Sequence, residues 1–486
     1  MRRDISTAIA SASGLSGQDR AAVLELCETY RSKLWRNRLR MAYYKLHRRP
    51  QDLGISVPPN LRDLEQAIGW PAKAVDALAD RSQFDGFVTD DDETTSELQA
   101  IVATNGLKRL YRKAVKSELQ MCCSFLTVTA GDREAGEPAA VISAHPADAA
   151  AAIWDDHARR IACGMAVVDR DRRSGHGDEP TWVNVFTSDA VIRIRRGRAG
   201  WVAEYLPHSM GRPLMEPMAY DATLARPFGR SRITRAVMNL TDDAMRSSLR
   251  SEISAEFAAT TQKYLLGADE DALGDRSKWD AYIGSIFSVS RDEMGEVPQF
   301  GQLTQPSMQP HIDYMRSLAA RFSGETNVPM SDLGVVTDNP SSAEAIYAAK
   351  EPLVVDAQNL NADNGEALRD VALMALAVSR GTGFREQAEA GVTIQPKFRN
   401  PAMPSVVSQS DAMVKMISVL PWMAESDVAL EELGFSDDQI QRLRSDRAKA
   451  TSRALVASAT SGTGLALPTA NPDAAAQQAA AEAGGA

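Results

Sequence analysis

The sequence has 486 residues, of which 44% are hydrophobic, and a formal net charge of −10 at pH 7. A chain of this size can bury a real core and should divide into about two to four structural units, so we expect a globular protein. The sequence has 54 Lys plus Arg and 64 Asp plus Glu. This excess of acidic residues argues against a protein that binds DNA tightly by counterion release. An acidic surface is still compatible with DNA that slides past without sticking.

No apolar run approaches the roughly 20 residues that span a bilayer, and the first residues lack the apolar core of a secretory signal. We therefore expect a cytoplasmic protein without a membrane segment. The four cysteines have neither the number nor the spacing of a zinc site or a disulfide framework, and we interpret them as small buried side chains. They are Cys27, Cys122, Cys123 and Cys163.

The first 121 residues carry apolar side chains at three- and four-residue spacing, which is typical of helices with one buried face. This pattern predicts helices over residues 18–46, 61–82 and 95–121. The run Asp-Asp-Asp-Glu at residues 90–93 separates the last two. We interpret it as an acidic loop between helices, although such carboxylates are also the ligands of nuclease metal sites.

Between residues 123 and 220 the pattern changes to short runs rich in β-branched and aromatic residues, separated by Gly, Asp and Pro. It predicts an antiparallel sheet with one helical stretch near residues 149–159. The expected strands cover residues 125–129, 140–143, 164–168, 182–186, 191–194 and 201–205.

Four arginines cluster in this sheet region, namely Arg193, Arg195, Arg196 and Arg198. We interpret them as a charged hairpin edge that protects the sheet against aggregation. The alternative is a contact with DNA or with an acidic partner.

A long helix is predicted over residues 231–261, with Ser231 as its N-cap. At 1.5 Å per residue it should be on the order of 45 Å long. Residues 269–310 then hold short strand-like pieces, and helix resumes at residues 311–322. A long helix, an extended insert and a returning helix can form one protruding unit.

A loop rich in helix breakers follows over residues 324–340, and a further helix is predicted over residues 341–379. Ser341 and Glu344 have the spacing of a capping box at its start. Pro352 should kink or break this helix, because proline removes a backbone donor and clashes with the preceding turn.

The C-terminal part of the chain predicts two more helices, over residues 411–420 and 427–450. Residues 461–486 are mostly Ala, Gly, Pro and Gln, with almost no large apolar side chain. We expect this tail to be disordered, because it cannot bury enough apolar surface to fold.

The sequence lacks the glycine-rich phosphate loops of nucleotide enzymes and the Gly-x-Ser-x-Gly nucleophile elbow. Its six histidines are scattered, and no pair has the spacing that puts two imidazoles on one helix face. The nearest ligand cluster, Asp155-Asp156-His157, would point in different directions from a helix, so we interpret it as a solvated face. We therefore expect no catalytic residue, no metal, no cofactor and no enzymatic activity.

Several short strings follow one another in order over most of residues 40–355. The first group comprises Tyr43-Tyr44, LGISVPP at 53–59, GWP at 69–71, AVDALA at 74–79 and GF at 86–87. The second group comprises GRP at 211–213 and RPFGRSRI at 226–233, and the third comprises PSSAEAI at 340–346 and EPL at 351–353. Together and in this order they resemble the portal proteins of long-tailed, double-stranded DNA bacteriophages. The resemblance fades beyond residue 450.

The resemblance implies an α+β, mainly α fold that assembles as a ring, with a wing, a stem of long helices, a small α/β clip and a helical crown. The implied parts in chain order are a wing at 1–230, a stem helix at 231–264, a clip at 265–310, a second stem helix at 311–323, a channel loop at 324–340, a long helix with the wing return at 341–400, crown helices at 401–455 and a disordered tail at 456–486.

The implied function is that of a portal, a ring of about twelve identical subunits at one capsid vertex that conducts DNA during packaging and ejection. The implied partners are the major capsid protein and scaffold, the terminase large subunit, the head–tail adaptor and the double-stranded DNA in the channel. The implied location is the virion, after assembly in the host cytoplasm. Two alternatives stay open: a metal-dependent nuclease or other DNA-processing enzyme, and a capsid or scaffolding protein.

Candidate site residues follow from the resemblance and from the placement of the loops. The acidic start of the clip is a candidate docking surface for the motor or the connector, with Asp269, Glu270, Asp271 and Asp275. The channel candidates are Asp338, Asn339, Pro340 and Ser341, with Lys350 as a weak phosphate contact.

The predicted long helix carries charges on two edges. Projected at about 100° per residue, Arg235, Arg246 and Arg250 fall on one edge, and Glu252 and Glu256 lie roughly a quarter turn away. A head-to-tail contact of basic edge with acidic edge in a ring satisfies this pattern. Packing within one subunit is the alternative.

Overall fold

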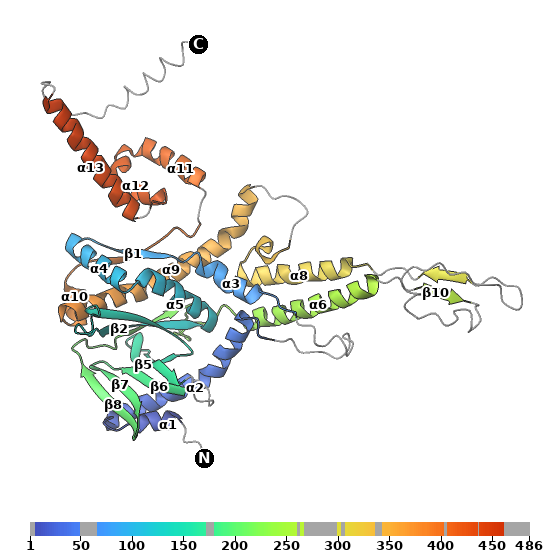
Figure 1. The fold of residues 1–486 in the computed structure, drawn as a ribbon, viewed down its shortest axis with the longest axis horizontal. Coiled ribbons are helices and arrows are strands. Elements are labelled where there is room, and N and C mark those ends of the chain that lie inside the picture. The colour runs from blue at the N-terminus through green and yellow to red at the C-terminus, as the bar shows by residue number, and fades with distance from the viewer. Residues whose placement is uncertain are drawn as a thin grey trace, which may run out of the picture. The chain divides into compact units, whose positions relative to one another are not determined.

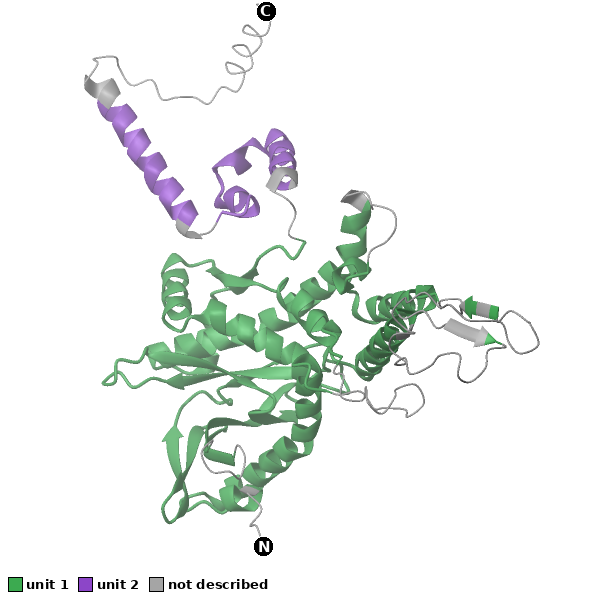
Figure 2. Ribbon diagram, turned by 45° about the vertical axis from the view of Figure 1, so that its right-hand side comes forward, with its two compact units in different colours: residues 1–402 green, residues 403–486 purple. Residues whose placement is uncertain are grey.

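The computed structural model describes residues 5–48, 66–171, 179–259, 263–266, 299–302, 307–335, 343–402, 406–435 and 437–460. The chain divides into two compact units, Met1–Ala402 and Met403–Ala486 (Figure 2). Helical residues outnumber strand residues, so the predicted mixed and mainly helical class is confirmed. None of the described helices is both long and apolar enough to cross a membrane.

The first predicted helix is confirmed as α2 (Gly17–Tyr44), which follows the short α1 (Ile5–Ala10). The hydroxyl of Ser16 caps α2 by accepting a hydrogen bond from the backbone N–H of Asp19 at 3.1 Å. The second predicted helix is shorter than expected, because α3 (Trp70–Ala79) begins with a proline in its first turn. Residues 61–65 of that prediction lie outside the described residues.

The third predicted helix, over residues 95–121, is two helices, α4 (Asp92–Thr104) and α5 (Leu107–Met121). Gly106 separates them with a φ of 57°, a left-handed conformation that glycine adopts at little cost. The side chain of Asn105 fixes the break, because its amide donates to the carbonyl of Ala140 and its oxygen accepts from the N–H of Ile142.

The acidic run at residues 90–93 is not a loop between helices, as predicted, because β1 (Phe84–Thr89) precedes it. The Asp91 carboxylate accepts a hydrogen bond from the N–H of Thr94 at 2.8 Å, and Asp92 and Glu93 lie in the first turn of α4. Negative charge at a helix N-terminus is favourable, and the hydrogen bonds to Thr94 lower the pKa of Asp91. The run is a helix cap.

A five-stranded antiparallel sheet confirms most of the predicted strands, and its strand order follows the chain. Helices α1 and α2 pack against it around a core that includes Val23, Leu26 and Met165. Its strands are β4 (Ala150–Asp155), β5 (Arg160–Asp171), β6 (Glu179–Phe186), β7 (Ala190–Gly197) and β8 (Gly200–Pro207).

The predicted helix near residues 149–159 is wrong, because these residues form β4 and the turn into β5. Alanine favours helices, but Ala150, Ala151 and Ala152 are all at most 6% exposed. Both faces of β4 are therefore covered, and small side chains let α2 pack closely against the strand. Tertiary packing overrides local propensity here.

A second sheet has the order β3-β2-β9, with β2 (Cys123–Ala130) in the middle, β3 (Ala140–Pro146) and β9 (Met215–Ala219). Helices α5 and α9 (Ala343–Arg380) pack against this sheet. The strand β9 and the antiparallel pair of β1 with β12 (Ile394–Phe398) were not predicted.

Two long helices, α6 (Arg235–Ala259) and α8 (Gln309–Thr326), lie side by side, and β10 (Lys263–Leu266) pairs with β11 (Gln299–Gln302) beyond them (Figure 1). We call the described residues between 235 and 326 the arm. The predicted long helix and returning helix are confirmed, whereas most of the insert predicted at residues 269–310 lies outside the described residues. The returning helix reaches Thr326, so the predicted loop begins later, at Asn327.

Ser231 does not cap the long helix, as predicted, because its hydroxyl is buried and donates to the carbonyl of Gln120 at 2.6 Å. The helix begins four residues later. The hydroxyl of Thr234 takes the capping role by accepting from the N–H of Val237 at 3.2 Å.

Helix α9 continues through Pro352, so the predicted break does not occur. A short helix, α10 (Phe384–Glu389), follows it, and η3 (Met330–Leu333) precedes it.

The second unit contains α11 (Val406–Val419), η4 (Pro421–Glu425), α12 (Asp427–Glu432) and α13 (Asp437–Thr460). The predicted helix over 427–450 is interrupted near Gly434, which has a φ of 88°. Helix α13 reaches Thr460, beyond the predicted start of the tail at residue 456. Residues 461–486 lie outside the described residues.

Candidate functional site at the base of the arm

The buried guanidinium of Arg232 joins the arm to the body of the first unit. Its Nε donates to the carbonyl of Ala74 in α3 at 2.6 Å, and its Nη2 donates to the carbonyl of Thr326 at the end of α8. Its Nη1 donates to the Tyr220 hydroxyl at 2.8 Å and to Asp356 of α9 at 3.2 Å. One side chain, 4% exposed, therefore contacts four segments where the arm begins and ends.

The acceptors around Arg232 suit its chemistry. A guanidinium has five N–H donors in a planar fork and stays charged, so it can satisfy carbonyls and a carboxylate at once. Asn327 donates to the same oxygen of Asp356 at 3.1 Å. A buried charge with this many partners fixes geometry, because any shift of one segment leaves a polar group unpaired.

Aromatic residues extend this attachment to α2 and α3. The Tyr43 hydroxyl donates to Asp242 of α6 at 2.9 Å, and burial raises the pKa of Tyr43. The rings of Trp70 and Phe322 lie 5.1 Å apart, which packs the start of α3 on α8. Both arm helices are thus held by the N-terminal helices as well as by Arg232.

A second buried arginine, Arg212, ties the segment before β9 to α9. It forms ion pairs with Glu216 and with Asp370, the latter at 3.0 Å, and its guanidinium lies 4.3 Å from the ring centroid of Phe384. Burial raises the pKa of Glu216 to about 7, although Arg212 opposes this shift. Helix α9 therefore carries an acidic partner for each of the two arginines.

Residues from two of the three groups of strings singled out in the sequence form these contacts. Tyr43, Trp70 and Ala74 come from the first group, and Arg212 and Arg232 come from the second. Segments from across the first unit thus supply the residues that fix the base of the arm and that hold α9 to the segment before β9. The sequence pattern indicated these strings but not the hydrogen bonds and ion pairs that join them.

The predicted interface residues lie along α6. Two of them, Arg246 and Glu252, have partners within the same chain. Arg246 pairs with Asp243, and Glu252 accepts a hydrogen bond from Gln66. Arg235, Glu252 and Glu256 are exposed, whereas Arg246 and Arg250 are half-buried. The ring-contact hypothesis stays a prediction.

The predicted clip and channel residues lie outside the described residues, except Lys350. These are Asp269, Glu270, Asp271, Asp275, Asp338, Asn339, Pro340 and Ser341. Lys350 is a half-buried residue of α9.

The four predicted basic-edge arginines lie on β7 and in its turn, and β7 is not an edge strand because β8 pairs with it. Arg195 stacks on Trp182, with its guanidinium carbon 3.9 Å from a ring centroid. Arg196 pairs with Glu179 at 3.7 Å, and Arg193 lies opposite Glu204 in the β7–β8 register. The prediction of a sheet edge is wrong.

The Asp155-Asp156-His157 cluster is a turn and not the helix face that the sequence predicted. The Asp155 carboxylate accepts from the N–H groups of His157 and Ala158 at 2.9 and 3.0 Å, which lowers the pKa of Asp155. Among the residues that the structure describes, no group of three His, Cys, Asp or Glu side chains is placed to hold a metal ion.

A buried polar cluster between α5 and α9 was not predicted. Asn364 donates to the fully buried Glu118 at 2.9 Å, and Ser82 bonds to both Tyr111 and Asn361. Burial raises the pKa of Glu118 to about 8. The sequence did hold a signal: Glu118 follows Tyr111, Ala114 and Val115 at helical spacing, on the face of α5 that is otherwise apolar.

Two curated proteins are similar to this chain along most of its length. The portal protein of Mycobacterium phage D29 is 24% identical over 414 residues, which cover 83% of each chain. The portal protein of Mycobacterium phage L5 is 24% identical over 415 residues, with the same coverage. The predicted resemblance to phage portal proteins is confirmed by these relatives.

No protein-family model matches the chain. Among solved structures, a chain from the neck of a native GTA particle, computed with C12 symmetry, is 13% identical, with a TM-score of 0.39 over 82% of this chain and 98% of that one. A chain from the neck of an empty GTA particle, computed with C6 symmetry, is also 13% identical, with a TM-score of 0.42 over 76% and 91%.

Proposed function

We propose that this chain is the portal protein of a tailed double-stranded DNA bacteriophage. About twelve copies form a closed ring at one vertex of the capsid, and DNA passes through its channel during packaging and ejection. The observation that carries the proposal is the alignment with the two mycobacteriophage portal proteins, which spans 83% of both chains. A match of this breadth involves a shared fold and not one shared string.

In this proposal the arm is the stem and the start of the clip. Helices α6 and α8 are the two stem helices, β10 and β11 open the clip, residues 327–340 are the channel loop, and the second unit is the crown. The buried Arg232 then has a mechanical task, because it holds the stem to the wing while DNA moves through the ring.

The proposed partners follow from the same assignment. The terminase large subunit and the head–tail adaptor dock in turn on the acidic clip residues 269–275, and the capsid protein and scaffold surround the ring. The channel loop, with Asp338 to Ser341 and with Lys350 beyond it, faces the DNA. The chain acts as a passive conduit in the virion and assembles in the host cytoplasm, and its net charge of −10 disfavours sticking.

The first test is the assembly state of the purified protein, measured by light scattering and negative-stain imaging. We expect closed rings of about a dozen subunits with a central hole. A stable monomer that cleaves DNA with added magnesium contradicts the proposal and favours the nuclease alternative. Closed shells favour a capsid or scaffolding protein.

The charged edges of α6 give a prediction for ring contacts. Reversing Arg246 and Arg250 to Glu is expected to lower the fraction of protein in rings, because a basic edge facing an acidic neighbour becomes repulsive. Size-exclusion chromatography with light scattering measures this fraction. Reversal of the exposed pair Arg109 and Arg112 on α5 is the matched control and should leave the rings intact. Unchanged rings in the α6 variant assign these arginines to packing within the subunit.

A further inference from the structure

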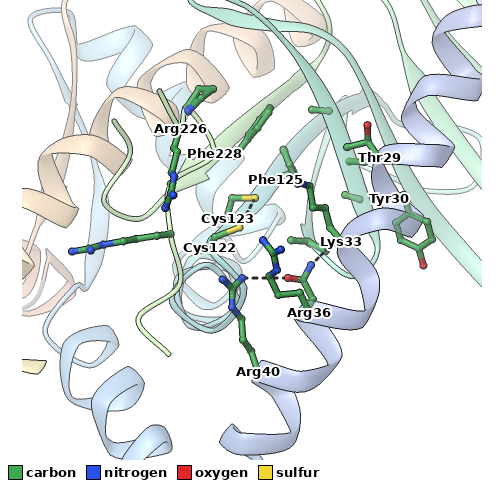
Figure 3. A pocket seen from close by; sticks show the side chains of 18 residues that line it. Thr29, Tyr30, Lys33, Arg36, Arg40, Cys122, Cys123, Phe125, Arg226 and Phe228 are labelled. Atoms are coloured by element: carbon green, nitrogen blue, oxygen red, sulfur yellow. Dashed lines mark hydrogen bonds between the residues drawn. The ribbon is translucent and has the colours of Figure 1, made fainter. Parts of the chain in front are cut away.

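A pocket of about 380 Å³ lies between α2 and the loop at residues 226–230. Figure 3 shows Lys33, Arg36 and Arg40 on α2, with Arg226 and Phe228 across the pocket. Neither the portal assignment nor the arm uses this pocket. Its lining has two chemically different parts, a cationic rim and an apolar floor.

The rim carries five cationic side chains and no carboxylate among the pocket's lining residues. They are Lys33, Arg36, Arg40, Arg226 and Arg230. Three of them belong to a stretch, residues 30–51, that holds eight Lys or Arg and no Asp or Glu, in a chain with a net charge of −10. A local field of this sign attracts anionic groups.

Most of this positive charge has no counter-ion within the described part of the chain. Lys33, Arg36 and Arg226 are exposed, and no carboxylate of the described residues pairs with them. Arg230 does pair with Asp221. Arg40 donates to the carbonyl of Met121 at 2.7 Å, and its Nε is buried without a hydrogen-bond partner among the described residues.

The floor of the pocket is apolar and aromatic. The rings of Phe125 and Phe228 lie 5.9 Å apart, and the ring of Trp154 lies 5.8 Å from that of Phe228. Alanines of β4 and the thiol of Cys122 complete the lining. Concave apolar surface of this kind takes up an apolar side chain of a partner.

The geometry points to a docking site for an acidic peptide segment of another protein, with one apolar side chain inserted on the Phe125–Phe228 floor and flanking carboxylates paired with the cationic rim. A DNA backbone fits this arrangement less well, because phosphates lie along a convex surface and leave a concave aromatic floor unused. An isolated small anion also leaves the floor unused.

Cys122 supplies an internal reporter for occupancy. It lines the pocket and is only partly buried, whereas Cys27, Cys123 and Cys163 are buried. The side-chain hydrogen bond with Cys123 and the nearby Arg40 lower the pKa of Cys122 to about 7. Because the thiolate is the reactive form, Cys122 should react with iodoacetamide faster than the other three cysteines at neutral pH.

The test uses the purified full chain and a fluorescein-labelled peptide of about ten residues with one Phe flanked by Glu. We expect binding by fluorescence anisotropy, and slower alkylation of Cys122 by iodoacetamide, followed by peptide mass spectrometry. Peptides with Ala in place of Phe, or with Gln in place of Glu, should bind more weakly. A DNA duplex and inorganic phosphate serve as the competing anions and should not protect Cys122.

The decisive variant reverses two rim charges, Lys33→Glu and Arg226→Glu, both on exposed side chains. It should weaken peptide binding about tenfold or more, whereas the control pair Arg38→Glu and Arg112→Glu, outside the pocket, should change it less than about twofold. Equal affinity of the decisive variant and the unmodified chain overturns the proposal. Tighter binding of the duplex, lost in the same variant, overturns it in favour of a phosphate site.

Discussion

Replacing Arg232 by Ala is expected to lower the free energy of unfolding by about 3–5 kcal/mol, one of the largest single-residue effects in this chain. The side chain is 4% exposed, and its loss leaves Asp356 without its charged partner and the carbonyls of Ala74 and Thr326 without this donor. Urea denaturation followed by circular dichroism measures the change. The Arg232→Lys variant should also be destabilised, because an ammonium lacks the planar fork that reaches four acceptors.

The neighbouring Arg230 is the matched control for this prediction. Its side chain is 60% exposed and its ion pair with Asp221 lies at the surface. Arg230→Ala should therefore change the free energy of unfolding by less than about 1 kcal/mol. If Arg232→Ala and Arg230→Ala behave alike, Arg232 does not hold the arm to the body.

Replacing Glu118 by Gln is expected to remove a pH dependence of stability. Burial raises the pKa of Glu118 from 4.5 to about 8 in the folded chain. Between these values the unfolded chain has released this proton while the folded chain retains it, so stability falls as the pH rises. The loss is about 1.4 kcal/mol per pH unit, and about 5 kcal/mol over the window.

Urea denaturation at pH values of about 5, 6, 7 and 8 tests this expectation. The Glu118→Gln variant keeps an acceptor for Asn364 and cannot ionise, so it should lack this slope and be more stable than the unmodified chain at pH 8. Glu366 is an exposed carboxylate on α9, the helix that carries Asn364, and Glu366→Gln is the control that should keep the slope. Parallel pH curves for the Glu118→Gln variant and the unmodified chain refute the prediction.

Helical periodicity in the sequence was enough to predict α2, α6 and the returning helix of the arm. It failed at β4, where an alanine-rich stretch has the composition of a helix and becomes a strand because both of its faces are covered. It also merged α4 with α5, since a single Gly106 gives a weak signal for a break. In each case the deciding contact comes from residues distant in the sequence.

The candidate site shows the same limit. Ser231-Arg232 was singled out by its resemblance to portal strings, but the role of Arg232 depends on Ala74 and Thr326, which lie 158 and 94 residues away. Both acceptors are backbone carbonyls, which leave no trace in the residue type. The basic stretch of α2 is visible in the sequence, whereas Arg226, on the opposite side of the pocket, comes almost two hundred residues later.

Helix α9 links the two buried arginines over a long distance. Asp356 pairs with Arg232 at the base of the arm, and Asp370 pairs with Arg212 beside the three-stranded sheet. These carboxylates are about 21 Å apart along one uninterrupted helix, at 1.5 Å per residue. The base of the arm and the segment before β9 are therefore both held by one helix, through two ion pairs separated by about four helical turns.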